Sequence, residues 1–333
     1  MSKSSSFQTV ANKIKSGKDV IQISKNFDRK DSLYFMETII NALQDKSCRI
    51  QYLSFQNINM VFSEDAIKLL TNFLKTNKTI ISLELNMSYE NTKQAFKDIG
   101  SMFAKNKTII YFSLTCENPD TGISNVADKN MKYLTEGLKR SNLEKLSFFG
   151  TGLTSKGASE VAKLIRNPAT SLTNVDIANN YISKNAFTSV LLPAIRKNVT
   201  LTEFEMFRNI EDDDEEESMS ELIELELEKN KLIQILFSQY STTKKQQYYS
   251  GLSGFFTKTQ QQYIKGKSNP KGKVQNFNNV DVPLDIRLMI HQFMPRNLRN
   301  NIDSFIEWVN QNYENTPEIA RILRKLRYYK KLK

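Results

Sequence analysis

An Asn-x-Thr phrase followed by an apolar residue occurs three times in this chain, 29 and then 92 residues apart. The phrase begins at Asn77, Asn106 and Asn198. After each phrase, apolar residues stand at offsets of 0, 3 and 5 from its first Ile or Leu, and the same triplet appears three more times without the phrase. The six triplets are Ile50, Leu53 and Phe55; Ile80, Leu83 and Leu85; Ile109, Phe112 and Leu114; Leu143, Leu146 and Phe148; Leu172, Val175 and Ile177; and Leu201, Phe204 and Met206. Their first residues are 30, 29, 34, 29 and 29 positions apart, and such a regular period predicts a protein built from stacked repeats.

Each repeat has two halves with different periods. In the first repeat, Leu53 and Phe55 alternate with polar residues, as in a strand with one buried side. Ser63 then precedes a stretch in which apolar residues recur every three or four positions, so it is the expected N-cap of a helix. One strand and one helix cannot bury an apolar face alone, so neighbours must stack into a common core. The pattern therefore predicts an α/β solenoid, with a curved parallel sheet inside and helices outside.

The triplets, the room for a full helix in each repeat and Asn180 resemble the ribonuclease-inhibitor type of leucine-rich repeat. The resemblance covers residues 48–237 and implies the same solenoid fold. The asparagine that this type places after the strand is clear only at Asn180 and Asn209. In the repeat that begins at Ile109, residues 116–125 are expected to be an insertion between strand and helix. Residues 1–47 are expected to form an N-terminal cap or a degenerate repeat, with helical periodicity at Ser32–Leu43.

Charge divides the chain into two parts. The formal net charge is +11, yet residues 1–239 hold 30 Lys and Arg against 30 Asp and Glu, whereas residues 240–333 hold 17 against 6. Residues 238–279 are rich in Gln, Lys, Ser and Asn, which is typical of a basic connector. Residues 280–333 show apolar stripes that predict a small helical C-terminal module. The acidic string Glu211–Glu217 is expected to be a solvated loop before a helix that starts near Ser218 or Ser220.

Residues 282–294 resemble the start of an F-box. Pro283, an acid, Ile286 and later apolar residues up to Met294 follow the order found in the helix that docks a ubiquitin-ligase scaffold. The resemblance implies such a scaffold as a partner at Pro283–Met294. The alternative is a helix that belongs to a plain structural bundle.

The residues that catalysis and metal binding require are scarce. His291 is the only histidine, so neither a catalytic triad nor a histidine-containing zinc site is expected. Cys48 and Cys116 fall in different repeats and form neither a disulfide framework nor a metal cluster. No glycine-rich phosphate loop occurs. We therefore expect a protein that is not an enzyme, with no catalytic residues, metal or cofactor.

The sequence also predicts a location. Its apolar runs are far shorter than the roughly 18 residues of a membrane span, and the first residues have no apolar signal region. With only two cysteines, these features predict a cytoplasmic protein. Degenerate repeats, an added C-terminal module and a composition rich in Lys, Asn and Ile resemble the leucine-rich-repeat effectors that intracellular bacteria deliver into host cells. This resemblance implies delivery without a conventional signal peptide.

The concave face of a solenoid is its usual binding surface. The side chains expected to line it, and to contact a partner protein, are Tyr52, Ser54, Gln56, Ser82, Glu84, Asn86, Tyr111, Ser113, Lys145, Ser147, Phe149, Asn174, Asp176, Glu203, Glu205 and Phe207. Four aromatic residues in this set are the candidate anchors. Acids gather on the last strands, which predicts a partner with a basic patch.

Three hypotheses on function remain open at this point. The first is a monomeric interaction protein that binds a protein on the concave face. The second is a ubiquitin-ligase substrate adaptor in which the F-box-like string docks the ligase. The third is a protein that binds a polyanion, either nucleic acid or an anionic membrane, through the basic tail.

Overall fold

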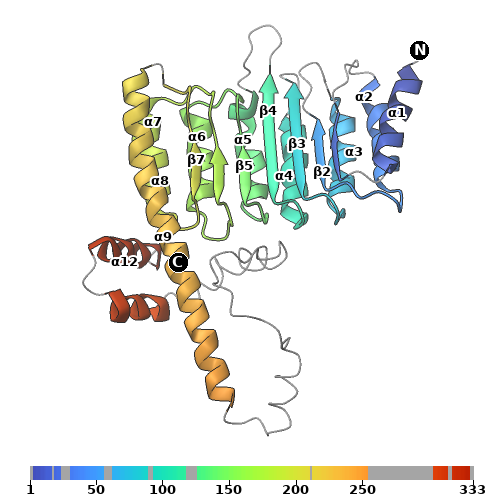
Figure 1. Ribbon diagram of the computed structural model, residues 1–333. Helices are drawn as coiled ribbons and strands as arrows, with labels where there is room; N and C mark the ends of the chain where they lie inside the picture. Colours follow the sequence, from blue (N-terminus) through green and yellow to red (C-terminus); the bar gives the residue numbers. More distant parts are fainter. Residues whose placement is uncertain are drawn as a thin grey trace. The chain divides into compact units, whose positions relative to one another are not determined.

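A computed structural model of the chain describes residues 3–16, 19–23, 31–55, 62–88, 93–117, 126–210, 212–253, 303–313 and 317–330. The chain divides into two compact units, Met1–Asn230 and Lys231–Lys333. The first unit holds a seven-stranded sheet whose strands are all parallel and follow one another in sequence order (Figure 1). The strands are β1 (Val20–Gln22), β2 (Tyr52–Phe55), β3 (Ser82–Ser88), β4 (Tyr111–Glu117), β5 (Lys145–Ser147), β6 (Asn174–Asp176) and β7 (Glu203–Glu205).

Helices connect successive strands, and α3 to α6 cover one side of the sheet (Figure 1). The helices of the first unit are α1 (Lys3–Lys15), α2 (Ser32–Leu43), α3 (Glu64–Leu74), α4 (Lys93–Lys105), α5 (Val126–Leu138), α6 (Ser155–Arg166), α7 (Lys184–Ala186), the π-helical turn η2 (Phe187–Leu191) and α8 (Leu192–Lys197). Helix α9 (Asp213–Ser253) crosses the boundary between the two units in the sequence. The predicted α/β class with a parallel sheet is therefore confirmed.

The apolar triplets form the core between the sheet and the helices. The register aligns their middle residues in one continuous row, and every member of the row is buried. The row is Leu53, Leu83, Phe112, Leu146, Val175 and Phe204. Ser63 is the N-cap of α3, as predicted, and its hydroxyl accepts a 3.2 Å hydrogen bond from the backbone of Ala66.

Two of the three Asn-x-Thr phrases tie their repeat to the one before it, whereas the side-chain nitrogen of Asn77 bonds to Thr79 within its own phrase. The side-chain oxygen of Asn106 accepts hydrogen bonds from the backbone N–H groups of Thr108 (2.8 Å) and Ile109 (2.9 Å). Its side-chain nitrogen donates a 2.6 Å bond to the carbonyl of Leu74, in the preceding repeat. Asn198 is bonded in the same way, with Ile165 as its acceptor at 2.8 Å. Asparagine suits this position because it offers both an acceptor and two donors.

Asn180 and Asn209 play the corresponding part after the strands. The side-chain nitrogen of Asn180 donates to the carbonyl of Phe148 in the preceding repeat at 2.8 Å, and its oxygen accepts from the backbone of Thr151 at 3.0 Å. Asn209 donates to the carbonyl of Ile177 at 2.9 Å. These bonds satisfy backbone groups that the turns would otherwise leave unpaired.

The structure corrects three expectations about the ends of elements. Helix α9 begins at Asp213, so most of the acidic string is helical and not a loop. Asp212 accepts a bond from the backbone of Glu215 at 3.0 Å, and acids are stabilised at the positive end of a helix. The same helix continues to Ser253, so the first part of the expected connector is helical. Cys116 lies within β4, so the expected insertion starts later than predicted.

The N-terminal region forms one more strand and helix, as well as a helix that the sequence did not predict. Strand β1 pairs in parallel with β2, and α2 follows it. Helix α1 buries Phe7, Val10, Ala11 and Ile14 in the same core. These residues cover the first repeat and thus close that end of the core.

The described part of the second unit is helical. It consists of the end of α9, a helix at 303–313 and α12 (Pro317–Lys330). Phe305, Val309, Ile322 and Leu326 are fully buried, in agreement with the predicted apolar stripes. Residues 254–302, which include the rest of the expected connector, lie outside the described residues.

Candidate protein-binding face

The side of the sheet that faces away from α3 to α6 carries the alternate side chains of the strands, and we call it the open face. The register sets these side chains in rows across the strands. The central row is Ser54, Glu84, Ser113, Ser147, Asp176 and Glu205. The row before it is Tyr52, Ser82, Tyr111, Lys145, Asn174 and Glu203. The structure thus brings together the predicted site residues of β2 to β7, while Gln56 lies outside the described residues.

Part of this face is less exposed than the sequence suggested. The predicted site residues that are buried are Ser54, Ser82, Glu84, Asn86, Ser113 and Ser147. Neighbouring strands are only about 4.8 Å apart, so short side chains sit between the longer ones of adjacent strands. Tyr111 is half-buried for the same reason, while Lys145, Glu203 and Glu205 are exposed. The exposed part of the face therefore lies over β5 to β7.

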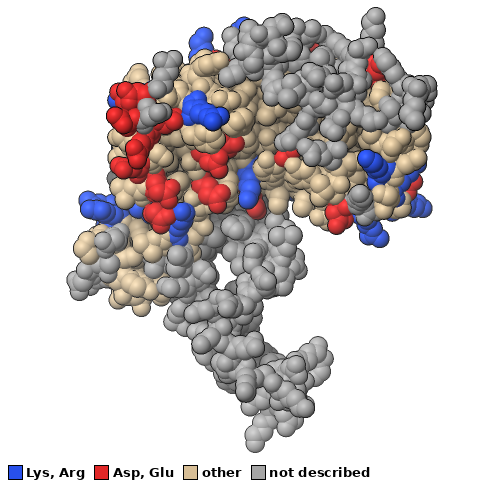
Figure 2. Space-filling model, turned by 45° about the horizontal axis from the view of Figure 1, so that its top comes forward, with Lys and Arg blue, Asp and Glu red and all other residues tan. Residues whose placement is uncertain are grey.

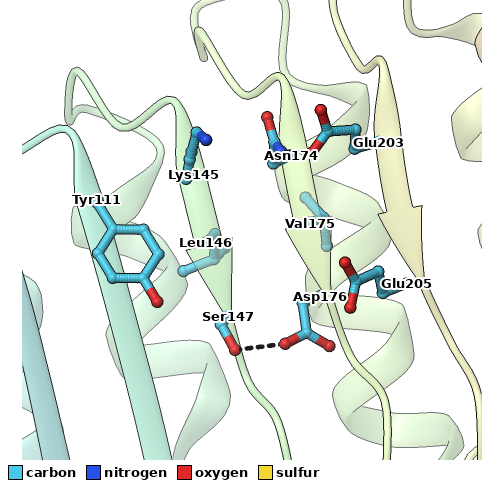
Figure 3. Close-up of a pocket in the computed structure, with 9 residues that line it drawn as sticks. All are labelled: Tyr111, Lys145, Leu146, Ser147, Asn174, Val175, Asp176, Glu203 and Glu205. Atoms are coloured by element: carbon cyan, nitrogen blue, oxygen red, sulfur yellow. Dashed lines mark hydrogen bonds between the residues drawn. The ribbon is translucent and has the colours of Figure 1, made fainter.

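A hollow of about 170 Å³ opens on this exposed part. We call it the acidic hollow, and Figure 3 shows the side chains around it. It is lined by Tyr111, Lys145, Leu146, Ser147, Asn174, Val175, Asp176, Glu203 and Glu205. Ser147 donates a 2.7 Å hydrogen bond to Oδ2 of Asp176, whose Oδ1 accepts a 2.9 Å bond from the backbone of Ala178. These two bonds fix the orientation of the Asp176 carboxylate.

The charges in the hollow are not balanced. It contains three carboxylates and one cation, Lys145, and no ion pair joins Lys145 to these carboxylates among the described residues. Asn174 donates a hydrogen bond to Glu203, whereas the side-chain carboxylate of Glu205 accepts no hydrogen bond from the described residues. Figure 2 shows acidic side chains gathered at the end of the surface that carries β7 and the start of α9 in Figure 1. The exposed end of the face therefore favours a positively charged group.

Two exposed aromatic rings lie beside the hollow. Phe149 and Phe207 follow β5 and β7, and 36% and 47% of their surfaces are exposed. Their ring centroids are 6.4 Å apart, so they form a contact across the intervening strand. Phe149 lies two residues beyond Ser147, and Phe207 lies two residues beyond Glu205. In extended chain this spacing places each ring about 7 Å from its residue of the hollow. We call them the aromatic pair, and they offer an apolar contact next to the acids.

A second acidic group lies toward the other end of the central row. Oε2 of Glu84 accepts a 2.7 Å hydrogen bond from Ser54, and Glu84 is buried. Tyr52 and Tyr111 lie on the neighbouring strands opposite Ser82, two residues before Glu84, and their phenols interact with the Glu84 carboxylate. The pKa of the Tyr52 phenol is raised above its ordinary value of 10.0. Burial is the main cause, and the Glu84 carboxylate is the second. The same two causes raise the pKa of Tyr111.

Several other features bear on the function. Within the ranges that the structure describes, no three His, Cys, Asp or Glu residues come together as they would around a metal ion. No helix in the same ranges is long and apolar enough to cross a membrane. The F-box-like string Pro283–Met294, with His291, lies outside the described residues.

No known protein family and no curated protein matches the chain.

Proposed function

We propose that this chain is a leucine-rich-repeat protein of the ribonuclease-inhibitor type, without enzymatic activity, that binds a partner protein through its open face. Support for the family comes from the spacing of the triplets and from the asparagines that join successive repeats. The observation that carries the binding role is the acidic hollow beside an exposed aromatic pair. Together they suit a partner segment with a Lys or Arg side chain next to an apolar residue.

The physical basis is complementarity between an unpaired carboxylate and a cation. Glu205 stands free at the hollow, and Asp176 is held in place by Ser147. A fixed acceptor loses little conformational freedom when a ligand binds. An apolar side chain of the partner that packs against Phe149 and Phe207 would bury ring surface that is otherwise exposed to water. In this proposal the charges give specificity and the rings add affinity.

The test measures binding of a fluorescently labelled Gly/Ser peptide that carries one Lys between two Leu residues. We expect the double variant Asp176→Asn with Glu205→Gln to weaken binding about tenfold, because it removes two charges that face the cation. The matched control, Asp65→Asn with Glu221→Gln, makes the same charge change on exposed helix positions. Equal losses in the two double variants would mean that only the net charge of the protein matters, and the proposal would fail.

A second candidate function rests on helix α12. Arg321, Arg324 and Arg327 are exposed and recur at three-residue intervals. The apolar side of the helix, including Ile322, is buried and therefore not free to enter a bilayer. This arrangement favours the phosphates of a nucleic acid as the partner of the basic region.

The test for this candidate compares labelled single-stranded RNA with vesicles that contain anionic lipid. We expect an RNA affinity that falls steeply with salt and is lost when the three arginines become Gln. Replacing Lys68, Lys78 and Lys156 with Gln is the control for net charge. Binding to the vesicles but not to RNA would contradict the nucleic-acid role.

A further inference from the structure

The central row links two acidic centres by an unbroken line of hydroxyl groups. Glu84 on β3 is followed by Ser113 on β4 and Ser147 on β5, and Asp176 on β6 comes next. Each acid accepts a 2.7 Å hydrogen bond from a serine of the preceding strand. Ser54 donates to Glu84, and Ser147 donates to Asp176. Three strand spacings separate the two acids, a distance of about 14 Å. The open face therefore repeats one Ser–carboxylate arrangement at a fixed interval.

The Glu84 carboxylate is buried without a compensating cation. Among the described residues, no Lys or Arg forms an ion pair with it. The groups that interact with it are neutral hydroxyls, those of Ser54, Tyr52 and Tyr111. A buried carboxylate is costly when only neutral donors surround it, and a cation would offset that cost.

Ser82 supplies an independent sign of a ligand at the same place. It lies between Tyr52 and Tyr111 in the register, two residues before Glu84 on the same face of β3. Only 8% of its surface is exposed, and its hydroxyl has no hydrogen-bond partner in the described part of the chain. Buried hydroxyls are nearly always paired, so one that is not paired is a candidate ligand contact.

We propose that Glu84, Ser82 and the rings of Tyr52 and Tyr111 form a second cation subsite on the open face. The partner segment then presents two Lys or Arg side chains about 14 Å apart, one at Glu84 and one in the acidic hollow. In an extended segment that crosses the strands, side chains four residues apart span roughly 13 Å and point to the same side. Glu84 neutralises the charge, Ser82 accepts a hydrogen bond, and the two rings provide cation–π contacts. This inference rests on the proposed function.

The test uses labelled Gly/Ser peptides with two lysines spaced two, four or eight residues apart, and a peptide with a single lysine. All two-lysine peptides carry the same charge, so only the spacing differs. We expect the four-residue spacing to bind about tenfold more tightly than the other two. Glu84→Gln keeps the size of the side chain and should abolish this preference, while the single-lysine peptide, seated in the acidic hollow, loses little affinity.

Ser82→Ala separates a binding role from a structural one. Removing an unpaired buried hydroxyl should leave the thermal unfolding midpoint unchanged or higher. The same change should weaken the peptide with four-residue spacing several-fold. Equal affinities for the three spacings, or a Glu84→Gln protein that keeps the preference, would overturn the subsite. The proposed function would still stand if the single-lysine peptide binds and depends on Glu205, and it would fall separately if that peptide does not bind.

Discussion

Ser147 on β5 donates a 2.7 Å hydrogen bond to Asp176 on β6, within the wall of the acidic hollow. The bond turns one side of the carboxylate toward the neighbouring strand and leaves the group anchored at the surface. Under the proposed function, this anchored acid and the Glu205 carboxylate beside it receive the cation of the partner.

The asparagine bonds between repeats should contribute measurably to stability. Asn106→Ala removes the side chain that pairs the carbonyl of Leu74 and the N–H of Ile109, both at buried positions. We expect a loss of about 1–3 kcal/mol in the free energy of unfolding, because backbone groups remain unpaired. Urea unfolding followed by circular dichroism measures it. Asn72→Ala on the exposed side of α3 is the control, and a loss there as large as at Asn106 would contradict this role.

Helices α4 and α5 approach closely at two glycines. A methyl group added to Gly137 would overlap the carbonyl group of Gly100. We therefore expect Gly137→Ala to push the helices apart and lower the free energy of unfolding by about 1–3 kcal/mol, although alanine favours helices. Thermal unfolding is the measurement, with Ser101→Ala on the exposed side of α4 as the control. A Gly137→Ala protein as stable as the parent would mean that the helices do not pack this tightly.

The two cysteines should differ sharply in reactivity. Cys116 is fully buried in β4, and burial raises the pKa of its thiol, so the reactive thiolate is scarce. Cys48 is only partly buried. In the folded protein a thiol reagent should modify Cys48 first, and Cys116 only after unfolding, as mass spectrometry of the labelled peptides would reveal. Rapid labelling of Cys116 under native conditions would be incompatible with its place in the core.

The raised pKa values of Tyr52 and Tyr111 predict a loss of stability at alkaline pH. A phenol whose pKa is raised by folding stays protonated in the native state, while the unfolded chain ionises near pH 10. Stability is therefore complete below about pH 10 and falls as the pH rises beyond it. Unfolding curves across this range should show a shallower fall for Tyr52→Phe. An unchanged slope would mean that the Tyr52 phenol is not held in its neutral form.

The sequence predicted the repeats well because their signal depends on short-range periodicity. Leu53 and its counterparts had to face the core, and the fixed period placed them in one row. Helix α1 was missed, although Phe7, Val10, Ala11 and Ile14 have helical spacing, because the serine-rich residues before them weaken the pattern. Alternation along a strand also gave the correct face for Glu84 without indicating its burial. Burial depends on which side chains the adjacent strands place beside it, and that is set by packing.

The candidate site was predictable in its members but not in its geometry. The sequence identified Asp176, Glu203 and Glu205 as acids on the last strands, and the register then brought them around one hollow. The segment at Ala178 runs between Phe149 and Phe207, since Ala178 accepts a backbone bond from Gly150 and Asn179 donates one to Phe207. A small side chain at Ala178 leaves room for the two rings to meet. Such relationships arise between repeats, so no single repeat reveals them.

The most direct test of the central claim is a double-mutant cycle between Glu205 and the lysine of the single-lysine peptide. Affinity is measured for the parent protein and for Glu205→Gln, each with the lysine peptide and with one in which methionine replaces lysine. If the lysine enters the hollow, the two changes should be coupled by roughly 0.5–1 kcal/mol, as for a partly exposed ion pair. The same cycle with Glu221→Gln should show no coupling. A coupling of zero at Glu205, with binding still intact, would contradict the assignment of the open face as the site of recognition.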